Sequence, residues 1–175
     1  MYNIAKICAA KGVILHCDGA QSPVSTDLSS ITNEVDLLSL SGHKMYGPMG
    51  IGVLYIRRDL QSGIEAVIYG GGQQQNLRSG TLPLPLCVGM GEAARYCVNK
   101  DAANERTHIK QLRDRFVEYL VKSDWKIQIN GPSFNERHPG NVNLQFEGFD
   151  AEDILGALQP KLAASTGSAC TSGIQ

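Results

Sequence analysis

The sequence predicts an α/β fold. Three short apolar runs, at residues 13–15, 36–40 and 51–56, each end in a polar or charged segment, as buried strands of the parallel type do. Connecting segments separate the runs, which is the alternation of strand and connector found in α/β proteins. Residues 85–98 and 109–120 place apolar side chains three and four positions apart, a pattern typical of amphipathic helices. Helices packed on a sheet of buried strands are therefore expected.

The chain begins with a helix, which we expect over residues 3–11. Ile4, Ile7 and Cys8 share one face of this helix. Gly12 follows where a left-handed residue commonly ends a helix. The first apolar strand then starts directly after the glycine.

The character of the chain changes after Trp125. Residues 127–129 and 142–146 alternate apolar and polar side chains, which predicts two half-buried antiparallel strands. Asp150 with Asp153 three positions later resembles a capping box and predicts a short helix after it. Between the two halves, the charged stretch 99–106 indicates a domain boundary or a bridging helix.

The composition excludes several classes of protein. The chain has 16 Lys and Arg against 17 Asp and Glu, and it has no long basic run, so nucleic acid and anionic lipid are not expected partners. No apolar stretch approaches the roughly 20 residues that span a bilayer. The first residues lack a secretory layout, and we expect a cytoplasmic protein. The cysteines form no CxxC pair, which argues against a zinc site or a disulfide framework.

Glycine marks where a ligand would bind. Many of the 19 glycines gather at 42–52, 70–72, 80 and 167–173. Glycine clusters occur where the backbone turns sharply or approaches a ligand closely, so several loops are expected to form one site. GPMGIG lacks the GxGxxG order and GGGQQQ lacks a P-loop ending, so nucleotide binding is not supported.

Lys44 is the first candidate for chemistry. It follows an apolar strand, inside a glycine-rich turn, with Ser41 and His43 beside it. Such a lysine can form a Schiff base with a carbonyl cofactor while its neighbours bind a phosphate. The alternative is a solvated lysine in a tight turn, which is the commoner role for a lysine taken alone.

Asp18 and Gln21 follow the preceding strand. Ligands of open α/β sheets gather outside the carboxyl ends of the strands, so Asp18 and Lys44 are expected to face one pocket. A pyridoxal ring needs this pairing, because a carboxylate keeps the ring nitrogen protonated while the lysine holds the aldehyde. The alternative for Asp18 is the N-cap of a helix.

Cys170 is the cysteine that small polar residues surround. A thiol in such a loop is accessible and is a candidate nucleophile. A buried structural role suits Cys8, Cys87 and Cys97. For Cys17 both roles stay open.

Six ordered segments resemble one family: HCDGAQ, SGHKMYGPMGIGVLYIRR, GGGQ, RSGT, HPGNVN and STGSACTSG. They are similar to the pyridoxal-phosphate-dependent cysteine desulfurases of the class V aminotransferases, in their iron–sulfur-cluster and nitrogen-fixation branch. The resemblance covers essentially the whole chain. It implies a fold-type I, aspartate-aminotransferase-like homodimer with a mostly parallel sheet in its large domain. Residues 1–98 would end this domain, and 99–175 would form a bridging helix and a partial small α+β domain with the catalytic cysteine loop.

The resemblance also implies how the cofactor, pyridoxal 5′-phosphate, is held. Lys44 would be the Schiff-base lysine, and Asp18 would be the partner of the pyridine nitrogen. Gln21 would bind the ring hydroxyl. Ser41 and His43 would bind the phosphate.

Two further roles follow from the resemblance. Thr81 would reach the phosphate bound by the partner subunit, and Cys170 would be the nucleophile. L-cysteine would yield L-alanine and a Cys170 persulfide, whose sulfur passes to an acceptor or iron–sulfur scaffold protein. No metal site made by protein ligands alone is implied, and Cys170 is the candidate iron–sulfur ligand.

The chain departs from the family at residues 74–76, Gln-Gln-Asn, where an acidic and basic pair is usual. Family members extend farther at both ends and supply there a ring-stacking histidine and a carboxylate-binding arginine. We therefore expect a partial sequence whose 175 residues alone are inactive. A selenocysteine lyase or another class V lyase is the alternative enzyme. A non-catalytic binding or dimerisation module is the alternative of another class.

Overall fold

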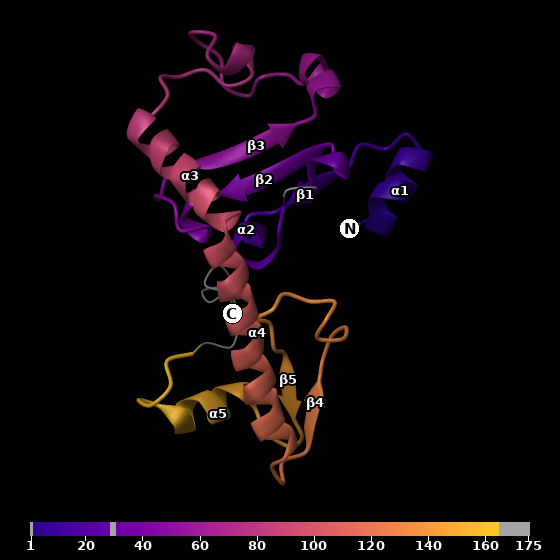
Figure 1. Ribbon diagram of the computed structural model, residues 1–175, viewed down its shortest axis with the longest axis vertical. Helices are drawn as coiled ribbons and strands as arrows, with labels where there is room; N and C mark the ends of the chain where they lie inside the picture. The colour runs from indigo at the N-terminus through magenta and orange to yellow at the C-terminus, as the bar shows by residue number, and fades with distance from the viewer. Residues whose placement is uncertain (1, 29–30, 165–175) are drawn as a thin grey trace. The chain divides into compact units, whose positions relative to one another are not determined.

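A computed structural model describes residues 2–28 and 31–164. The chain divides into two compact units, residues 1–110 and 111–175. Helix α4, Lys100–Val121, contributes to both units (Figure 1). The predicted domain division after residue 98 stays a prediction. None of the described helices is long and apolar enough to span a membrane.

The first unit contains a three-stranded sheet in the order β1-β2-β3 (Figure 1). Its strands are β1 (His16–Asp18), β2 (Leu37–Ser41) and β3 (Gly52–Ile56). β1 and β2 are parallel, as predicted, but β3 is antiparallel to β2, so the prediction of a third strand of parallel type is wrong. Residues 42–51 connect β2 to β3 without a crossover helix, and a connection this short returns the chain antiparallel.

The apolar run at residues 13–15 was predicted to form the first strand, but β1 begins after it, at His16. Its ladder with β2 begins at His16, and Val13 and Ile14 are 54% and 58% exposed. The Leu15 amide donates to the Asp36 carboxylate, and the Leu15 carbonyl accepts from the amides of Asp36 and Leu37. These bonds fasten Leu15 to the residues around the start of β2, so the paired strand forms from the polar segment that follows.

Among the described residues, three α-helices belong entirely to the first unit: α1 (Tyr2–Ala10), α2 (Ser22–Ser25) and α3 (Leu84–Cys97). α1 and α3 lie within one residue of their predicted ranges. Gly12 has a φ of +64°, which confirms the left-handed residue predicted at the end of the first helix. Short 3-10 turns cover Ile31–Asn33, Gly42–Lys44, Arg58–Gly63 and Gln74–Asn76.

The core of the first unit lies between α3 and the turn after β2. Met90, Ala93 and Cys97 on α3 are buried with Met45, whose side chain is 2% exposed. These α3 residues are spaced three and four apart, so one helical stripe covers the turn. The position of the turn is therefore fixed by the main hydrophobic cluster.

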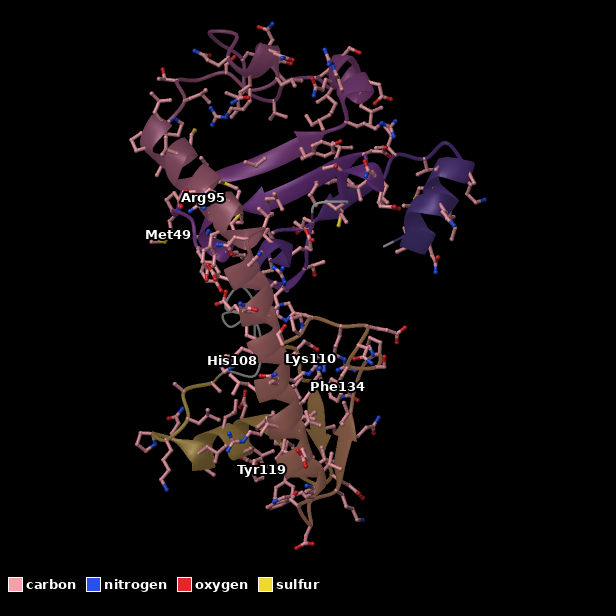
Figure 2. The ribbon with its side chains drawn as sticks, in the orientation of Figure 1. Met49, Arg95, His108, Lys110, Tyr119 and Phe134 are labelled. Carbon is pink, nitrogen blue, oxygen red and sulfur yellow. The ribbon has the colours of Figure 1, made fainter. Side chains whose placement is uncertain are left out.

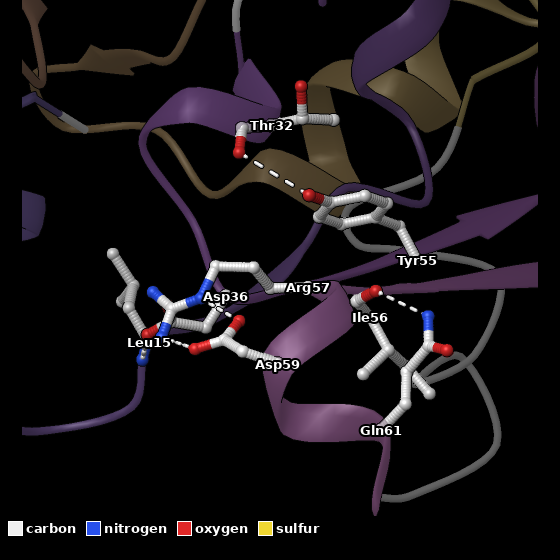
Figure 3. A network of polar contacts seen from close by, with 8 residues as sticks. All are labelled: Leu15, Thr32, Asp36, Tyr55, Ile56, Arg57, Asp59 and Gln61. Atoms are coloured by element: carbon white, nitrogen blue, oxygen red, sulfur yellow. Dashed lines mark hydrogen bonds and ion pairs between the residues drawn. The ribbon is translucent and has the colours of Figure 1, made fainter.

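A polar network closes the end of the sheet where β2 begins and β3 ends (Figure 3). Asp36 accepts from the Leu15 amide at 2.7 Å and pairs with Arg57, which also bonds Asp59. The Asp36 side chain is 13% exposed. One carboxylate thus joins the segments that lead into β1 and out of β3.

The second unit contains β4 (Ile127–Ile129) paired antiparallel with β5 (Leu144–Phe146), which confirms both predicted strands. Helix α5 covers Ala151–Leu158. The Asp150 side chain accepts from the Glu152 amide at 2.8 Å, which confirms the predicted short helix and Asp150 as its N-cap. The bond goes to Glu152 and not to Asp153, the residue with which Asp150 was predicted to form a capping box.

The buried face of α4 in the second unit differs from the predicted apolar stripe. Leu112 and Phe116 are each 51% exposed, whereas Arg113 and Val117 are 4% and 8% exposed. Arg113 is buried because its guanidinium lies 4.7 Å from the centre of the Phe134 ring and donates to the Phe134 carbonyl. Phe134 is labelled in Figure 2. Arg113 thus occupies an interior position because its guanidinium has hydrogen-bond and ring partners there, and a pattern of apolar residues does not predict such a position.

Candidate functional site

The parallel ladder brings the ends of β1 and β2 to one edge of the sheet. Asp18 is opposite Ser39, and Ser41 lies two residues farther along β2. Side chains alternate along a strand, so Asp18, Ser39 and Ser41 share one face. Asp18, predicted to act on the cofactor ring, and Ser41, predicted to bind the phosphate, therefore belong to the same face and the same end of the sheet.

The turn that carries Lys44 is closed by main-chain bonds. The Gly42 amide donates to Ile51 and the Gly47 amide donates to Gly42, both at 2.9 Å. A Cβ added to Gly42 would come within 2.8 Å of the Pro48 carbonyl oxygen, so a larger residue there would force the turn open. Lys44 itself is exposed and has no hydrogen bond or ion pair within residues 2–28 and 31–164. Its amine is available to a ligand.

Ser41 and His43 form a pair beside Lys44. The Ser41 hydroxyl oxygen lies 3.2 Å from His43 Nδ1. A hydroxyl and an imidazole this close are suitable donors for one phosphate group.

Asp18 makes a turn and does not cap a helix. Its Oδ1 accepts from the Ala20 amide at 3.0 Å, while the N-cap position of α2 is occupied by Gln21. The alternative role as a helix N-cap is therefore wrong. Oδ2 of Asp18 has no hydrogen bond in the described part of the chain. The Gln21 side chain is exposed and makes no cap hydrogen bond, so both residues keep polar atoms for a ligand.

Thr81 lies in a separate loop that Gln73 helps to organise. Gly80, with a φ of +116°, donates its amide to Gln73 Oε1 at 2.9 Å. Ser79 is 4% exposed, and its amide donates to the Ile68 carbonyl. Thr81 is exposed directly after these anchored residues.

The cysteines differ in their surroundings. Cys170 lies outside the described residues. Cys97 is 3% exposed, and burial raises the pKa of its thiol, as a structural cysteine requires. Cys8 and Cys87 are only half-buried, which corrects the prediction that they are buried, and Cys17 is half-buried too. No cluster of three metal-ligating side chains occurs among the residues that the structure describes.

Sequence reasoning missed one residue of the Lys44 turn, Tyr46. Its hydroxyl donates to Glu105 Oε1 at 2.9 Å, and its ring lies edge-on to Tyr96 at 5.6 Å between ring centres. Tyr46 as a whole is 59% exposed, but partial desolvation of its hydroxyl and the Glu105 contact raise its pKa to about 12. Tyr46 also has a φ of +66°, a left-handed conformation that costs a non-glycine residue about 1–2 kcal/mol. The position of Tyr46 two residues after Lys44 could have marked it as part of the site. No feature of the sequence near Tyr46 indicated that Glu105, 59 residues away, is its partner.

The chain matches the family described as "Aminotransferase class-V" over residues 1–174. It belongs to the class V aminotransferases. A class V aminotransferase relative, "Cysteine desulfurase IscS" of Rickettsia massiliae (strain Mtu5), is 44% identical over 170 residues, which are 97% of this chain and 41% of that protein. The chain thus spans about two fifths of the length of the curated relatives it matches.

Two solved structures are similar to this chain in fold and in sequence. A structure described as "NIFS-LIKE PROTEIN" matches with a TM-score of 0.77 and 29% identity, over 90% of this chain and 42% of that one. A structure described as "SspA in complex with cysteine" matches with a TM-score of 0.70 and 30% identity, over 98% of this chain and 46% of that one.

The donor set fits pyridoxal phosphate, the cofactor of this family. That cofactor requires an amine, donors for a phosphate and a carboxylate for the ring nitrogen. Lys44 has an amine without a partner in the described chain, and Ser41 and His43 are paired donors. Asp18 keeps one carboxylate oxygen without a hydrogen bond among the described residues.

Proposed function

We propose that the protein is a pyridoxal-phosphate-dependent cysteine desulfurase that converts L-cysteine to L-alanine and moves the sulfur to Cys170. The observation that carries the proposal is the parallel register of β1 and β2, with Asp18 and Ser41 on one face at the ends of their strands. The 44% identity to a cysteine desulfurase supports this choice of reaction. The matched structure described with bound cysteine supports the choice of substrate.

Each residue of the site has a proposed task. When bound, pyridoxal phosphate supplies an electron sink next to the α-carbon of an amino acid. Lys44 would hold the cofactor and then move the α-proton with its released amine. Asp18 would face the ring nitrogen with Oδ2 and Gln21 the ring hydroxyl. The pair of Ser41 and His43 would hold the phosphate.

The sulfur step is proposed for the Cys170 thiolate. It attacks the sulfur of the bound cysteine, so that an S–S bond forms and the substrate C–S bond breaks. The electron pair of that bond stays on the β-carbon, which takes a proton and becomes the methyl group of alanine. The sulfur is left as a Cys170 persulfide, from which an acceptor such as an iron–sulfur scaffold protein would take it.

We further propose that the protein acts as a cytoplasmic homodimer. Thr81 would contact the phosphate bound by the partner subunit. This placement is consistent with its exposure in a loop that is separate from the Lys44 turn.

The test measures alanine and protein persulfide after cysteine is added with pyridoxal phosphate to the purified full-length protein, since residues 1–175 alone are expected to be inactive. We expect equal amounts of alanine and transferred sulfur. A parallel reaction with selenocysteine separates a desulfurase from a selenocysteine lyase, which would use selenocysteine alone. A protein that binds no pyridoxal phosphate and forms no alanine would instead be a binding or dimerisation module.

A further inference from the structure

We propose that Glu105 is a positioning residue for Lys44 and acts through the hydroxyl of Tyr46. This inference rests on the proposed function, since it assigns a role toward the lysine that holds the cofactor. Glu105 belongs to the first turns of α4, and it is 59 residues from Tyr46 in the sequence.

The backbone after Lys44 is anchored at two successive residues. Met45 is 2% exposed, and its carbonyl accepts from the buried Cys97 thiol at 3.8 Å. Tyr46 then donates its hydroxyl to Glu105 at 2.9 Å. The end of α3 and the start of α4 thus hold the Lys44 turn through separate contacts.

Hydrogen bonds connect the start of α4 to the end of α3 and hold the backbone around Glu105 in place. Arg106 donates to the Cys97 carbonyl at 3.2 Å. The Asn99 side chain accepts from the Ala102 amide at 2.9 Å, as an N-cap residue does. Tyr96, the last residue before Cys97, lies edge-on to the Tyr46 ring.

The left-handed backbone of Tyr46 makes these contacts relevant to Lys44. A non-glycine residue keeps such a conformation only where its surroundings enforce it. Lys44 has no partner of its own within the described chain, so its direction depends on the backbone on either side. If Tyr46 loses Glu105, the turn can relax toward an ordinary conformation and turn the Lys44 amine away from the cofactor.

The experiment compares Tyr46→Phe, Glu105→Ala, Glu105→Gln and the Tyr46→Phe/Glu105→Ala double variant in the whole protein. Tyr46→Phe keeps the ring contact with Tyr96 and removes only the hydroxyl. Each protein is mixed with pyridoxal phosphate and reduced with borohydride, and the cofactor fixed to the peptide containing residue 44 is measured. Thermal unfolding is recorded alongside. Tyr119→Phe is the matched control, since this exposed tyrosine lies on α4 (Figure 2).

We expect Tyr46→Phe and Glu105→Ala each to need about tenfold more pyridoxal phosphate for half-maximal attachment, the effect of losing one charge-assisted hydrogen bond. The double variant should be no worse than either single one, because both remove the same bond. Glu105→Gln keeps an acceptor oxygen and should recover most of the attachment. If the bond between Tyr46 and Glu105 only stabilised the fold, the variants would have lower melting temperatures, but the attachment of pyridoxal phosphate would not be lost in Glu105→Ala and recovered in Glu105→Gln.

The outcomes separate the two ideas. If the unsubstituted protein fixes no cofactor at residue 44, the proposed function fails, and the inference fails with it. If it fixes the cofactor there and Tyr46→Phe does so equally well, the proposed function stands and the positioning role is wrong. The role is also overturned if Glu105→Gln is as defective as Glu105→Ala.

Discussion

Asp18 and Ser39 are opposite each other in the parallel ladder of β1 and β2. Because side chains alternate along a strand, a register shift of one residue would move Asp18 to the other face from Ser41. The register thus decides whether the Asp18 carboxylate and the turn that we propose binds phosphate can serve one ligand. The buried Leu38, 3% exposed on the opposite face, favours the observed register.

Asp18→Asn should abolish most turnover without abolishing cofactor binding. The amide oxygen can still accept from the Ala20 amide, but it has no charge to keep a ring nitrogen protonated. We expect alanine formation to fall by about a hundredfold or more. The rate is measured at saturating pyridoxal phosphate, with Asp124→Asn, an exposed aspartate, as control. An unchanged rate in Asp18→Asn would remove Asp18 from the mechanism.

Lys44→Ala should remove the covalent attachment of the cofactor. Lys44 is the exposed amine in the glycine turn after β2, next to the Ser41 and His43 pair. After borohydride treatment, mass spectrometry should find no pyridoxal on the peptide containing residue 44. Lys11→Ala, a change at an exposed lysine after α1, should leave the attachment intact. If the cofactor is fixed to another peptide of the Lys44→Ala protein at the original yield, Lys44 is not the attachment site.

Cys170→Ser should separate cofactor binding from sulfur transfer. Cys170 is far along the chain from Asp18 and Lys44, so the protein should keep its yellow colour and still respond spectrally to cysteine. It should form no protein persulfide. Cys17→Ser is the informative comparison, because Cys17 is on β1 beside Asp18. Loss of persulfide in Cys17→Ser alone would reassign the nucleophile.

Local patterns in the sequence were sufficient for several elements. The spacing of Met90, Ala93 and Cys97 predicted α3 and its buried face, and the alternation at residues 127–129 predicted β4. The N-cap role of Asp150 was predictable because the helix that it caps starts at the next residue, although its bond goes to Glu152 and not to Asp153. Each of these features depends on contacts within one element or its immediate neighbours.

The errors concern contacts between distant segments. The direction of β3 depends on the length of the connection from β2, and apolar content does not reveal it. The position of Arg113 depends on Phe134, 21 residues away, and that of Tyr46 on Glu105, 59 residues away. For the site, strand ends predicted that Asp18 and Lys44 belong together, but not what holds the Lys44 turn.

Asp36→Ala should destabilise the sheet more than Asp59→Ala, although both residues bond Arg57 (Figure 3). Asp36 is 13% exposed and also accepts from the Leu15 amide, whereas Asp59 is 64% exposed. Leaving that amide without its partner should cost about 1–3 kcal/mol of unfolding free energy. Asp36→Asn keeps an acceptor and should cost less. Urea unfolding measures all three, and equal losses for Asp36→Ala and Asp59→Ala would contradict the assigned role of the Leu15 bond.

Alkaline pH should weaken the protein through Tyr46. Burial and the Glu105 contact raise its pKa from 10.0 to about 12, so the folded chain holds this proton more tightly than the unfolded chain. The stabilising contribution is therefore complete below the unfolded pKa and is lost as the pH rises through the folded one. Melting temperatures of the unsubstituted protein and Tyr46→Phe should converge as the pH rises from about 10 to about 12, between the unfolded and the folded pKa. The difference in melting temperature between the unsubstituted protein and Tyr119→Phe should not shrink in this way. If the difference between the unsubstituted protein and Tyr46→Phe grows as the pH rises, Glu105 does not keep the Tyr46 phenol neutral.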